Sequence, residues 1–304
     1  MNTKNNSAKL LTQSDLIVRS LIFREKFTIL REFIGNPPYN VRTVQNIGIK
    51  ALLIAITLLI SSGAPPVDSK IDVVVIDPGH GGRDPGTSGK HLKEKDVVLK
   101  ISLKLGALIE QNFPGVKVVY TRKEDRYLGL DDRASLANKS KADLFICIHA
   151  NSVPRPDTYG TETYVMGPHK TEGNMEVAKR ENAVMLYDEN YQERYEGFDP
   201  NSPESYILFS LAQSAFQESS LKFADKIERQ FKHKAGRYSH GVKQAGFWVL
   251  WRTAMPSVLV EVGFLTNAKE EQFLGTAQGQ DTIAASLFRA FKEYKTQVEA
   301  INQN

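Results

Sequence analysis

The chain has 304 residues, of which 41% are apolar and 24% charged, and its formal net charge at pH 7 is +4. This composition is that of an ordinary globular protein, and a chain of this length can bury a sizeable core. The first 50 residues hold eight Lys and Arg against three Asp and Glu, so the excess positive charge lies there and a nucleic-acid-binding surface is not predicted.

Residues 1–64 have the pattern of an N-terminal leader. The apolar run ALLIAITLLI at 51–60 follows Lys50 and precedes small residues and two prolines. Ten apolar residues fall short of the roughly 20 that span a bilayer, so we expect an export signal that is either cleaved or retained as a membrane anchor. The long stretch before the run would follow from a start site assigned too early. The single cysteine, Cys147, excludes an intrachain disulfide.

Short apolar segments alternate with helical patterns from residue 71 to 298. Five of these segments are predicted strands, at 71–77, 116–121, 143–150, 161–166 and 258–265. They are continuously apolar, which is typical of strands buried on both faces. The first two enclose a helical pattern at 94–111, and another helix is expected at 279–298. We therefore predict a single α/β domain, a mostly parallel twisted sheet with helices on both faces.

The segment at about 167–240 interrupts this alternation. It is polar and biased towards helix, with helices expected at 173–190 and 204–232, and it shows no strand of the main pattern. We interpret it as a helical insertion beside the functional site.

A glycine-rich loop follows the first strand, in VVVIDPGHGGRDPG at 73–86. It does not match a dinucleotide-binding G-x-G-x-x-G turn, because Asp84 takes the last glycine position and would repel phosphate, and no P-loop motif is present. The glycines instead allow a sharp turn that exposes His80 beyond the end of the strand. In sheets of this class, ligands bind at the carboxyl ends of the strands.

Three residues are candidate metal ligands. His149 ends the predicted strand at 143–150, and Glu94 begins the helix that returns from the His80 loop. A hydrolytic zinc site needs three nitrogen or carboxylate ligands and an open position for water, which His80, Glu94 and His149 would supply. The pair His91 and Glu94 also fits an H-x-x-E pattern, as in zinc carboxypeptidases, but His91 has no strand to fix it. HExxH is absent.

Glu261 stands out because it lies inside the apolar sequence SVLVEVGFL. An unpaired carboxylate is costly to bury. One interpretation is an ion pair with Arg252 or Lys243. The other is a general base whose pKa is raised by burial and which acts on a metal-activated water.

These motifs together resemble the zinc-dependent N-acetylmuramoyl-L-alanine amidases of bacterial cell walls, of the amidase_3 type. The resemblance covers residues 71–295 and rests on VVVIDPGHGGRDPG, EKDVVL, ADLFICIHANS, GTETYV and MPSVLVEVGFLTN, in the order of that family. It implies one Zn²⁺ held by His80, Glu94 and His149, with Glu261 as the catalytic acid and base. The implied reaction is hydrolysis of the amide between N-acetylmuramic acid and the L-alanine of the peptidoglycan stem peptide.

The resemblance extends to regulation and to location. The segment at 167–240 is similar to family members in which an inserted helical arm blocks the site until an activator protein displaces it, and the resemblance suggests an acid of that arm as the blocking ligand: Glu189, Glu193, Glu196 or Glu204. The enzyme is expected to be exported to the periplasm or cell envelope.

Two alternative functions stay open. One is a catalytically silent peptidoglycan-binding or scaffold protein, and the other is a zinc carboxypeptidase built on His91 and Glu94.

Overall fold

The computed structural model describes residues 70–207, 209 and 215–300, and the predicted leader and its apolar run at 51–60 lie outside them. Among the described residues, no helix combines the length and the hydropathy needed to cross a membrane.

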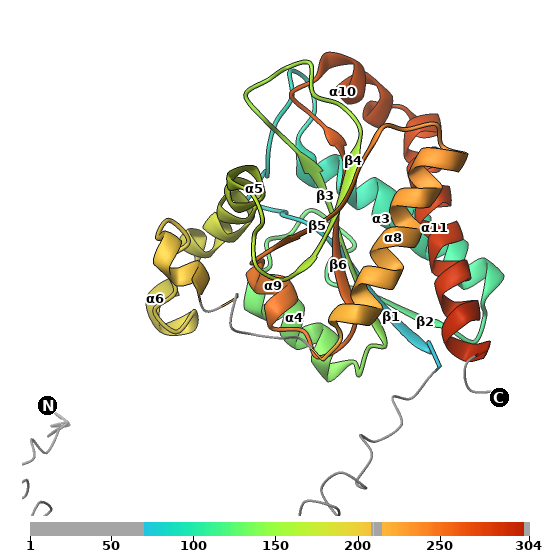
Figure 1. Ribbon diagram of the computed structural model, residues 1–304, viewed down its shortest axis with the longest axis horizontal. Coiled ribbons are helices and arrows are strands. Elements are labelled where there is room, and N and C mark those ends of the chain that lie inside the picture. Colours follow the sequence, from blue (N-terminus) through green and yellow to red (C-terminus); the bar gives the residue numbers. More distant parts are fainter. Residues whose placement is uncertain (1–69, 208, 210–214, 301–304) are drawn as a thin grey trace, which may run out of the picture. The chain divides into compact units, whose positions relative to one another are not determined.

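One mixed sheet of six strands forms the centre of the described part of the chain (Figure 1). Its order is β2-β1-β3-β6-β4-β5, and the first four strands in that order run parallel. β4 lies antiparallel to β6 and parallel to β5. The strands are β1 Val73–Pro78, β2 Lys117–Tyr120, β3 Leu144–Asn151, β4 Thr161–Met166, β5 Ser239–Ala245 and β6 Ser257–Phe264.

Helices cover both faces of the sheet, as predicted. Side chains alternate between the faces, so Ile146 of β3 packs in the core with α3, α8 and α11, whereas Phe145 packs in the core with α4, α5 and α9 (Figure 1). The longer helices are α3 Glu94–Asn112, α4 Leu130–Lys139, α5 Glu172–Asn182, α8 Gln217–Lys234, α10 Ala268–Gly275 and α11 Ala277–Ala300. Shorter ones are η1 Ala183–Tyr187, α6 Tyr191–Arg194, η2 Pro203–Tyr206 and α9 Trp248–Trp251.

The segment at 167–240 has two parts with different surroundings. Phe223, Ile227 and Phe231 of α8 recur at spacings of four residues and are fully buried in the core beside α11, so α8 is one of the helices that cover the sheet. The preceding elements α5, η1, α6 and η2 form a separate group, which we call the arm, residues 172–206.

The parallel strands β1, β3 and β6 place the predicted functional residues together at their carboxyl ends. Pro78 of β1 pairs with Ile148 of β3, and His149 of β3 pairs with Glu261 of β6. The loop carrying His80 therefore begins beside His149, and His149 lies next to Glu261. Parallel pairing brings the three segments together although they are far apart in sequence.

Candidate metal centre and active site

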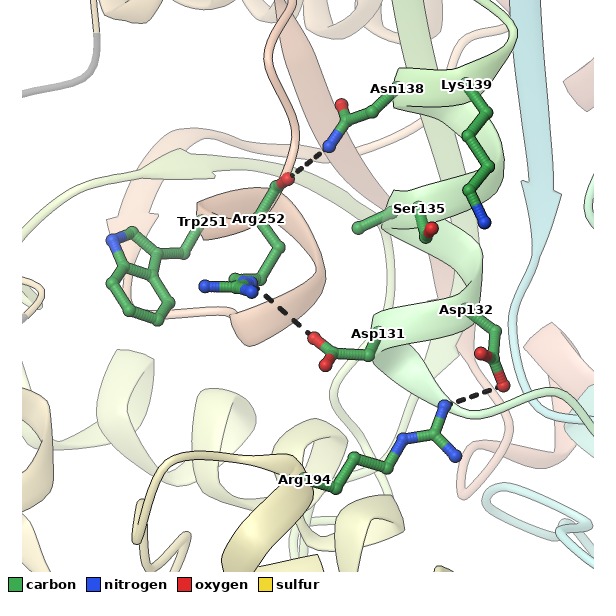
Figure 2. Close-up of a pocket in the computed structure, with 9 residues that line it drawn as sticks. Asp131, Asp132, Ser135, Asn138, Lys139, Arg194, Trp251 and Arg252 are labelled. Carbon is green, nitrogen blue, oxygen red and sulfur yellow. Dashed lines mark hydrogen bonds and ion pairs between the residues drawn. The ribbon is translucent and has the colours of Figure 1, made fainter.

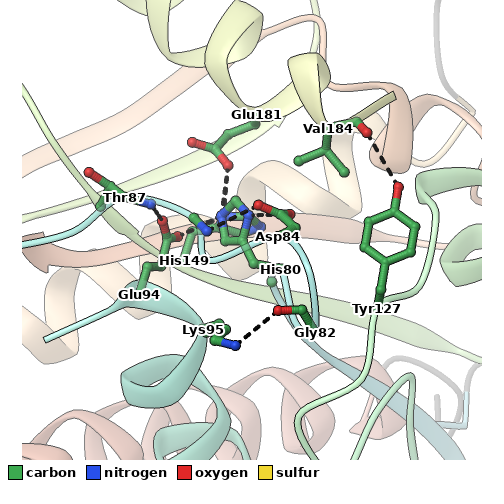
Figure 3. Close-up of polar contacts among 12 residues, drawn as sticks. His80, Gly82, Asp84, Thr87, Glu94, Lys95, Tyr127, His149, Glu181 and Val184 are labelled. Carbon is green, nitrogen blue, oxygen red and sulfur yellow. Dashed lines mark hydrogen bonds and ion pairs between the residues drawn. The ribbon is translucent and has the colours of Figure 1, made fainter. Parts of the chain in front are cut away.

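Two histidines and two glutamates converge in a buried cluster (Figure 3). One ligand atom from each of His80, Glu94, His149 and Glu181 lies within 4.8 Å of the others. Glu94 Oε1 is 3.1 Å from His80 Nε2 and 3.0 Å from His149 Nδ1. Glu181 Oε2 is 3.3 Å and 2.9 Å from the same two nitrogens. The structure thus brings together the three predicted ligands and adds a fourth residue, Glu181.

His80 is fixed by its own loop. Its backbone has φ of 59°, in the left-handed region that non-glycine residues rarely adopt, and Gly81 and Gly82 continue with positive φ. On the side of the ring away from the cluster, His80 Nδ1 lies 2.7 Å from Asp84 Oδ2. A carboxylate at this position holds the proton on Nδ1 and leaves Nε2 free to bind a metal.

Glu94 is held in place by the turn that precedes it. As the first residue of α3, it accepts hydrogen bonds from the backbone N–H groups of Thr87 at 2.8 Å and Ala150 at 2.9 Å. Burial alone would raise its pKa, but the charge of His80 and the close approach of both histidines lower the pKa to about 2. The carboxylate is therefore ionised and ready to bind a cation.

Glu261 lies next to this cluster without any ion pair to Arg252 or Lys243. Arg252 pairs with Asp131 and Glu196, and Lys243 pairs with Glu162. Both carboxylate oxygens of Glu261 are buried with no hydrogen-bond partner, and the nearest cation, Arg180 Nη2, is 3.7 Å away. Burial first, and then the charge of nearby Glu181, raise the pKa of Glu261 well above its ordinary value.

Glu181 reaches the cluster from α5 of the arm, together with its neighbour Arg180. Arg180 Nε donates to Glu181 Oε1 at 2.9 Å, and its other nitrogens donate to Ser152 O at 2.9 Å and Asn151 Oδ1 at 2.8 Å. Although burial would raise the pKa of Glu181, the charges of His149 and Arg180 lower it well below its ordinary value. The end of α5 is thereby fastened to the end of β3.

The four acids suggested as blocking ligands lie elsewhere on the arm. Glu189 and Glu193 are exposed, Glu196 pairs with Arg252 at the surface, and Glu204 hydrogen-bonds to Ser202.

Sequence reasoning missed Glu181, although the spacing of the apolar residues around it could have identified it. Val177, Ala178, Val184 and Met185 are buried and lie three or four residues away, so Glu181 is a carboxylate on the apolar face of a helix.

His91 is exposed and outside the cluster. Its backbone N–H donates to Glu271, at the turn that leads into α3. Glu94 faces His80 and His149 instead. The structure therefore does not form the His91–Glu94 ligand pair, because His91 lies in the turn before the helix that carries Glu94.

The donor set suits zinc. Two imidazole nitrogens and carboxylate oxygens are ligands that zinc prefers in hydrolases. His80 Nε2 and Glu181 Oε2 make their close contacts in the cluster without forming a hydrogen bond, which is costly for buried polar atoms unless a cation satisfies them. A cavity of about 250 Å³ opens onto His80, Glu181, Arg180 and Tyr187, so the cluster borders a space that admits a small group.

A second cavity, of about 710 Å³, lies away from the histidines where the arm meets α4 and α9 (Figure 2). Arg194 of the arm pairs with Asp132 there at 2.6 Å, and Arg252 lies 3.6 Å from Asp131. The first of these ion pairs attaches the arm to α4, and the second lies outside the arm. This cavity contains none of the cluster residues.

Known proteins resemble the chain over this same domain. The Amidase_3 family, described as N-acetylmuramoyl-L-alanine amidase, matches residues 74–293. The chain is 34% identical over 226 residues to the N-acetylmuramoyl-L-alanine amidase AmiC of Escherichia coli O6:H1, covering 73% of this chain and 52% of AmiC. It is also 34% identical to AmiA of Escherichia coli K12, covering 73% of this chain and 75% of AmiA. The chain thus spans about half the length of AmiC.

A solved structure agrees with the sequence comparisons. The N-acetylmuramoyl-L-alanine amidase from Clostridium difficile 630 superposes with a TM-score of 0.56 at 27% identity, covering 74% of this chain and 97% of that protein. The matched region contains β1, β3 and β6 with the buried histidine and glutamate cluster at their ends. The chain therefore belongs to the N-acetylmuramoyl-L-alanine amidase family.

Proposed function

We propose that this protein is a zinc-dependent peptidoglycan hydrolase that cleaves the amide between N-acetylmuramic acid and the L-alanine of the stem peptide. The observation that carries the proposal is the convergence of His80, Glu94 and His149 in a buried cluster next to Glu261, whose carboxylate oxygens have no hydrogen-bond partner. Family membership supplies the substrate class, and the donor set supplies the argument for zinc.

Each residue of the cluster has a role that its surroundings support. His80, Glu94 and His149 would hold the ion, with Asp84 orienting the His80 ring. Bound zinc supplies a Lewis acid that polarises the amide carbonyl and activates water. Glu261 takes a proton from the attacking water and passes one to the leaving amine.

The arm would inhibit this reaction through Glu181. Its carboxylate oxygen lies as close to the two histidines as that of Glu94, so in this arrangement it takes the position that water needs. Turnover then requires α5 to move and withdraw Glu181. We retain the inhibitory arm as a hypothesis and assign the blocking role to Glu181 in place of Glu189, Glu193, Glu196 or Glu204.

The arm is not free to detach as a whole. Tyr195, Phe198 and Tyr206 are buried, and Tyr195 and Phe198 pack against Trp248 of α9 with ring centroids about 5 Å apart. Deletion of 189–204 would therefore remove core aromatics along with the arm. We expect activation to displace α5 and η1 and to leave the rest attached.

We further propose that residues 1–64 direct export, that 71–298 form the catalytic domain, and that the enzyme acts in the periplasm or cell envelope. The apolar run at 51–60 would serve as a signal or anchor. A partner protein would displace α5. Among proteins of this fold, the CwlD amidase from Clostridioides difficile, 24% identical to this chain, has been solved in complex with the GerS lipoprotein.

The test is product analysis on purified peptidoglycan with Glu181→Ala protein, which removes the proposed block. Free stem peptides that begin with L-alanine and disappear on chelation support the amidase. Wall binding without any release would favour a catalytically silent binding or scaffold protein, and loss of only the C-terminal residue of the stem would indicate a carboxypeptidase.

A further inference from the structure

The backbone of the His80 loop is held by a buried arginine from another element. Arg133 of α4 is 1% exposed and reaches beneath the loop. Its Nη1 donates to Pro78 O at 2.8 Å, and its Nη2 donates to His80 O at 2.7 Å. The same Nη1 lies 2.7 Å from Asp77 Oδ1, so one guanidinium ties the end of β1 to the carbonyl of the metal-ligand residue.

Two more cations hold neighbouring carbonyls of the loop. Arg122, also 1% exposed, donates to Gly79 O at 2.7 Å as well as to Pro78 O at 3.0 Å. Lys95 Nζ donates to Gly82 O at 2.9 Å (Figure 3). Four successive or nearby carbonyls, those of Pro78, Gly79, His80 and Gly82, thus accept hydrogen bonds from cationic side chains, while the imidazole of His80 lies in the cluster.

The His80 backbone needs such a restraint. With φ of 59°, His80 is in a conformation that persists only where the surroundings determine it. Asp84 orients the imidazole ring but does not contact the His80 carbonyl. Arg133 contacts that carbonyl directly, and its planar fork of donors reaches two carbonyls and a carboxylate at once.

Stability alone does not explain a buried arginine here. Apolar residues of similar size often replace a buried ion pair with no loss of stability. The neighbouring buried positions of α4, Leu130, Ala134 and Ala137, are already apolar. What an apolar side chain cannot supply is the set of hydrogen bonds to Pro78 O and His80 O.

We propose that Arg133 is a positioning residue for metal binding: it fixes the backbone of His80 and so directs Nε2 into the cluster. This inference rests on the proposed zinc site. It assigns to the domain a further residue that acts on the ion only through His80.

The test compares zinc affinity in the full-length Arg133→Lys variant and the wild type, using a competing chromophoric chelator. Lysine keeps the charge beside Asp77 but has no planar fork with which to hold both carbonyls. We expect the zinc dissociation constant to rise roughly 10- to 100-fold, the range for partners that orient metal ligands. The absorption spectrum of the Co²⁺ form should change as well, because the position of His80 shifts.

The matched control is Arg237→Lys. Arg237 is nearly buried, pairs with Glu270, and donates to a strand carbonyl, that of Val262 at 3.2 Å, but it does not touch the His80 loop. This variant should lose a comparable amount of thermal stability and keep wild-type zinc affinity and Co²⁺ spectrum.

Wild-type affinity and spectrum in a less stable Arg133→Lys protein would overturn the proposal and leave Arg133 a structural residue. If Arg133→Lys does not fold without metal, the zinc affinity of the Asp77→Asn variant is the test instead. This variant removes the carboxylate that fixes the Arg133 guanidinium. A weakened zinc affinity in that variant supports the proposal, and an unchanged one overturns it. Wild-type protein that binds no zinc would contradict the metal centre itself.

Discussion

Replacing Glu181 with alanine tests whether the arm inhibits the enzyme. Glu181 is 5% exposed, and its carboxylate meets His80, His149 and Arg180. The substitution removes these contacts without disturbing helix formation, since alanine is the most favourable residue in a helix. If these contacts hold α5 closed, their loss shifts the protein towards the open, active state.

The size of the effect follows from the burial of the contacts. Removing one member of a buried charged pair typically costs about 3 kcal/mol or more. Because each 1.4 kcal/mol is about a factor of ten in an equilibrium, the open population should rise by roughly 100-fold, until the open state dominates. We therefore expect basal activity to rise by about 10- to 100-fold.

The assay is the rate of stem-peptide release from purified peptidoglycan at equal zinc occupancy, measured by metal analysis of the same samples. Glu176→Ala is the matched control, because Glu176 lies on the same helix, is exposed and pairs only with Lys179 among the described contacts. It should have wild-type activity. An unchanged or lower rate in Glu181→Ala at full zinc occupancy would refute the inhibitory role.

Three further outcomes are expected. Glu261→Gln should keep zinc, because Glu261 is not among the four convergent residues, and should lose about 100-fold or more in turnover; near-normal turnover would refute its role as acid and base. His149→Ala should lose the metal, as measured by zinc content after dialysis, and full occupancy would exclude His149 as a ligand. Glu228, buried among Thr161, Thr163 and Ser239, has a pKa raised by burial, so its carboxyl binds a proton more tightly in the folded state than in the unfolded one. Stability from this group is present below the unfolded pKa of about 4.5 and is lost as pH rises through the folded pKa. In urea unfolding, the stability of Glu228→Gln relative to wild type should therefore increase as the pH rises above 4.5, and a difference that does not change with pH would contradict this.

Continuous apolar sequence made the buried strands predictable. β1, β3 and β6 are buried on both faces, and their sequences contain little else but apolar residues before the functional side chains. β5 was not predicted, because this edge strand is half-exposed and its sequence SHGVKQA is mostly polar. Edge strands obtain their pairing from a neighbour, here β4, and carry little pattern of their own.

The candidate site was predictable where residues end strands or begin a helix. His80, Glu94 and His149 lie at such positions, and the parallel topology brings them together. Glu181 was not identified, because its approach depends on how α5 docks against the end of β3, a tertiary contact fixed by Arg180. The contribution of Arg133 is likewise invisible in sequence, since it depends on α4 packing beneath the His80 loop.

The central claim is that a zinc ion held by His80, Glu94 and His149 drives hydrolysis of the bond between N-acetylmuramic acid and L-alanine. The most direct measurement is the mass spectrum of products released from peptidoglycan by Glu181→Ala protein, with zinc and again after chelation. We predict stem peptides with a free L-alanine amino terminus that vanish on chelation and return when zinc is restored. Products cut at any other bond, or release that persists without metal, would contradict the account.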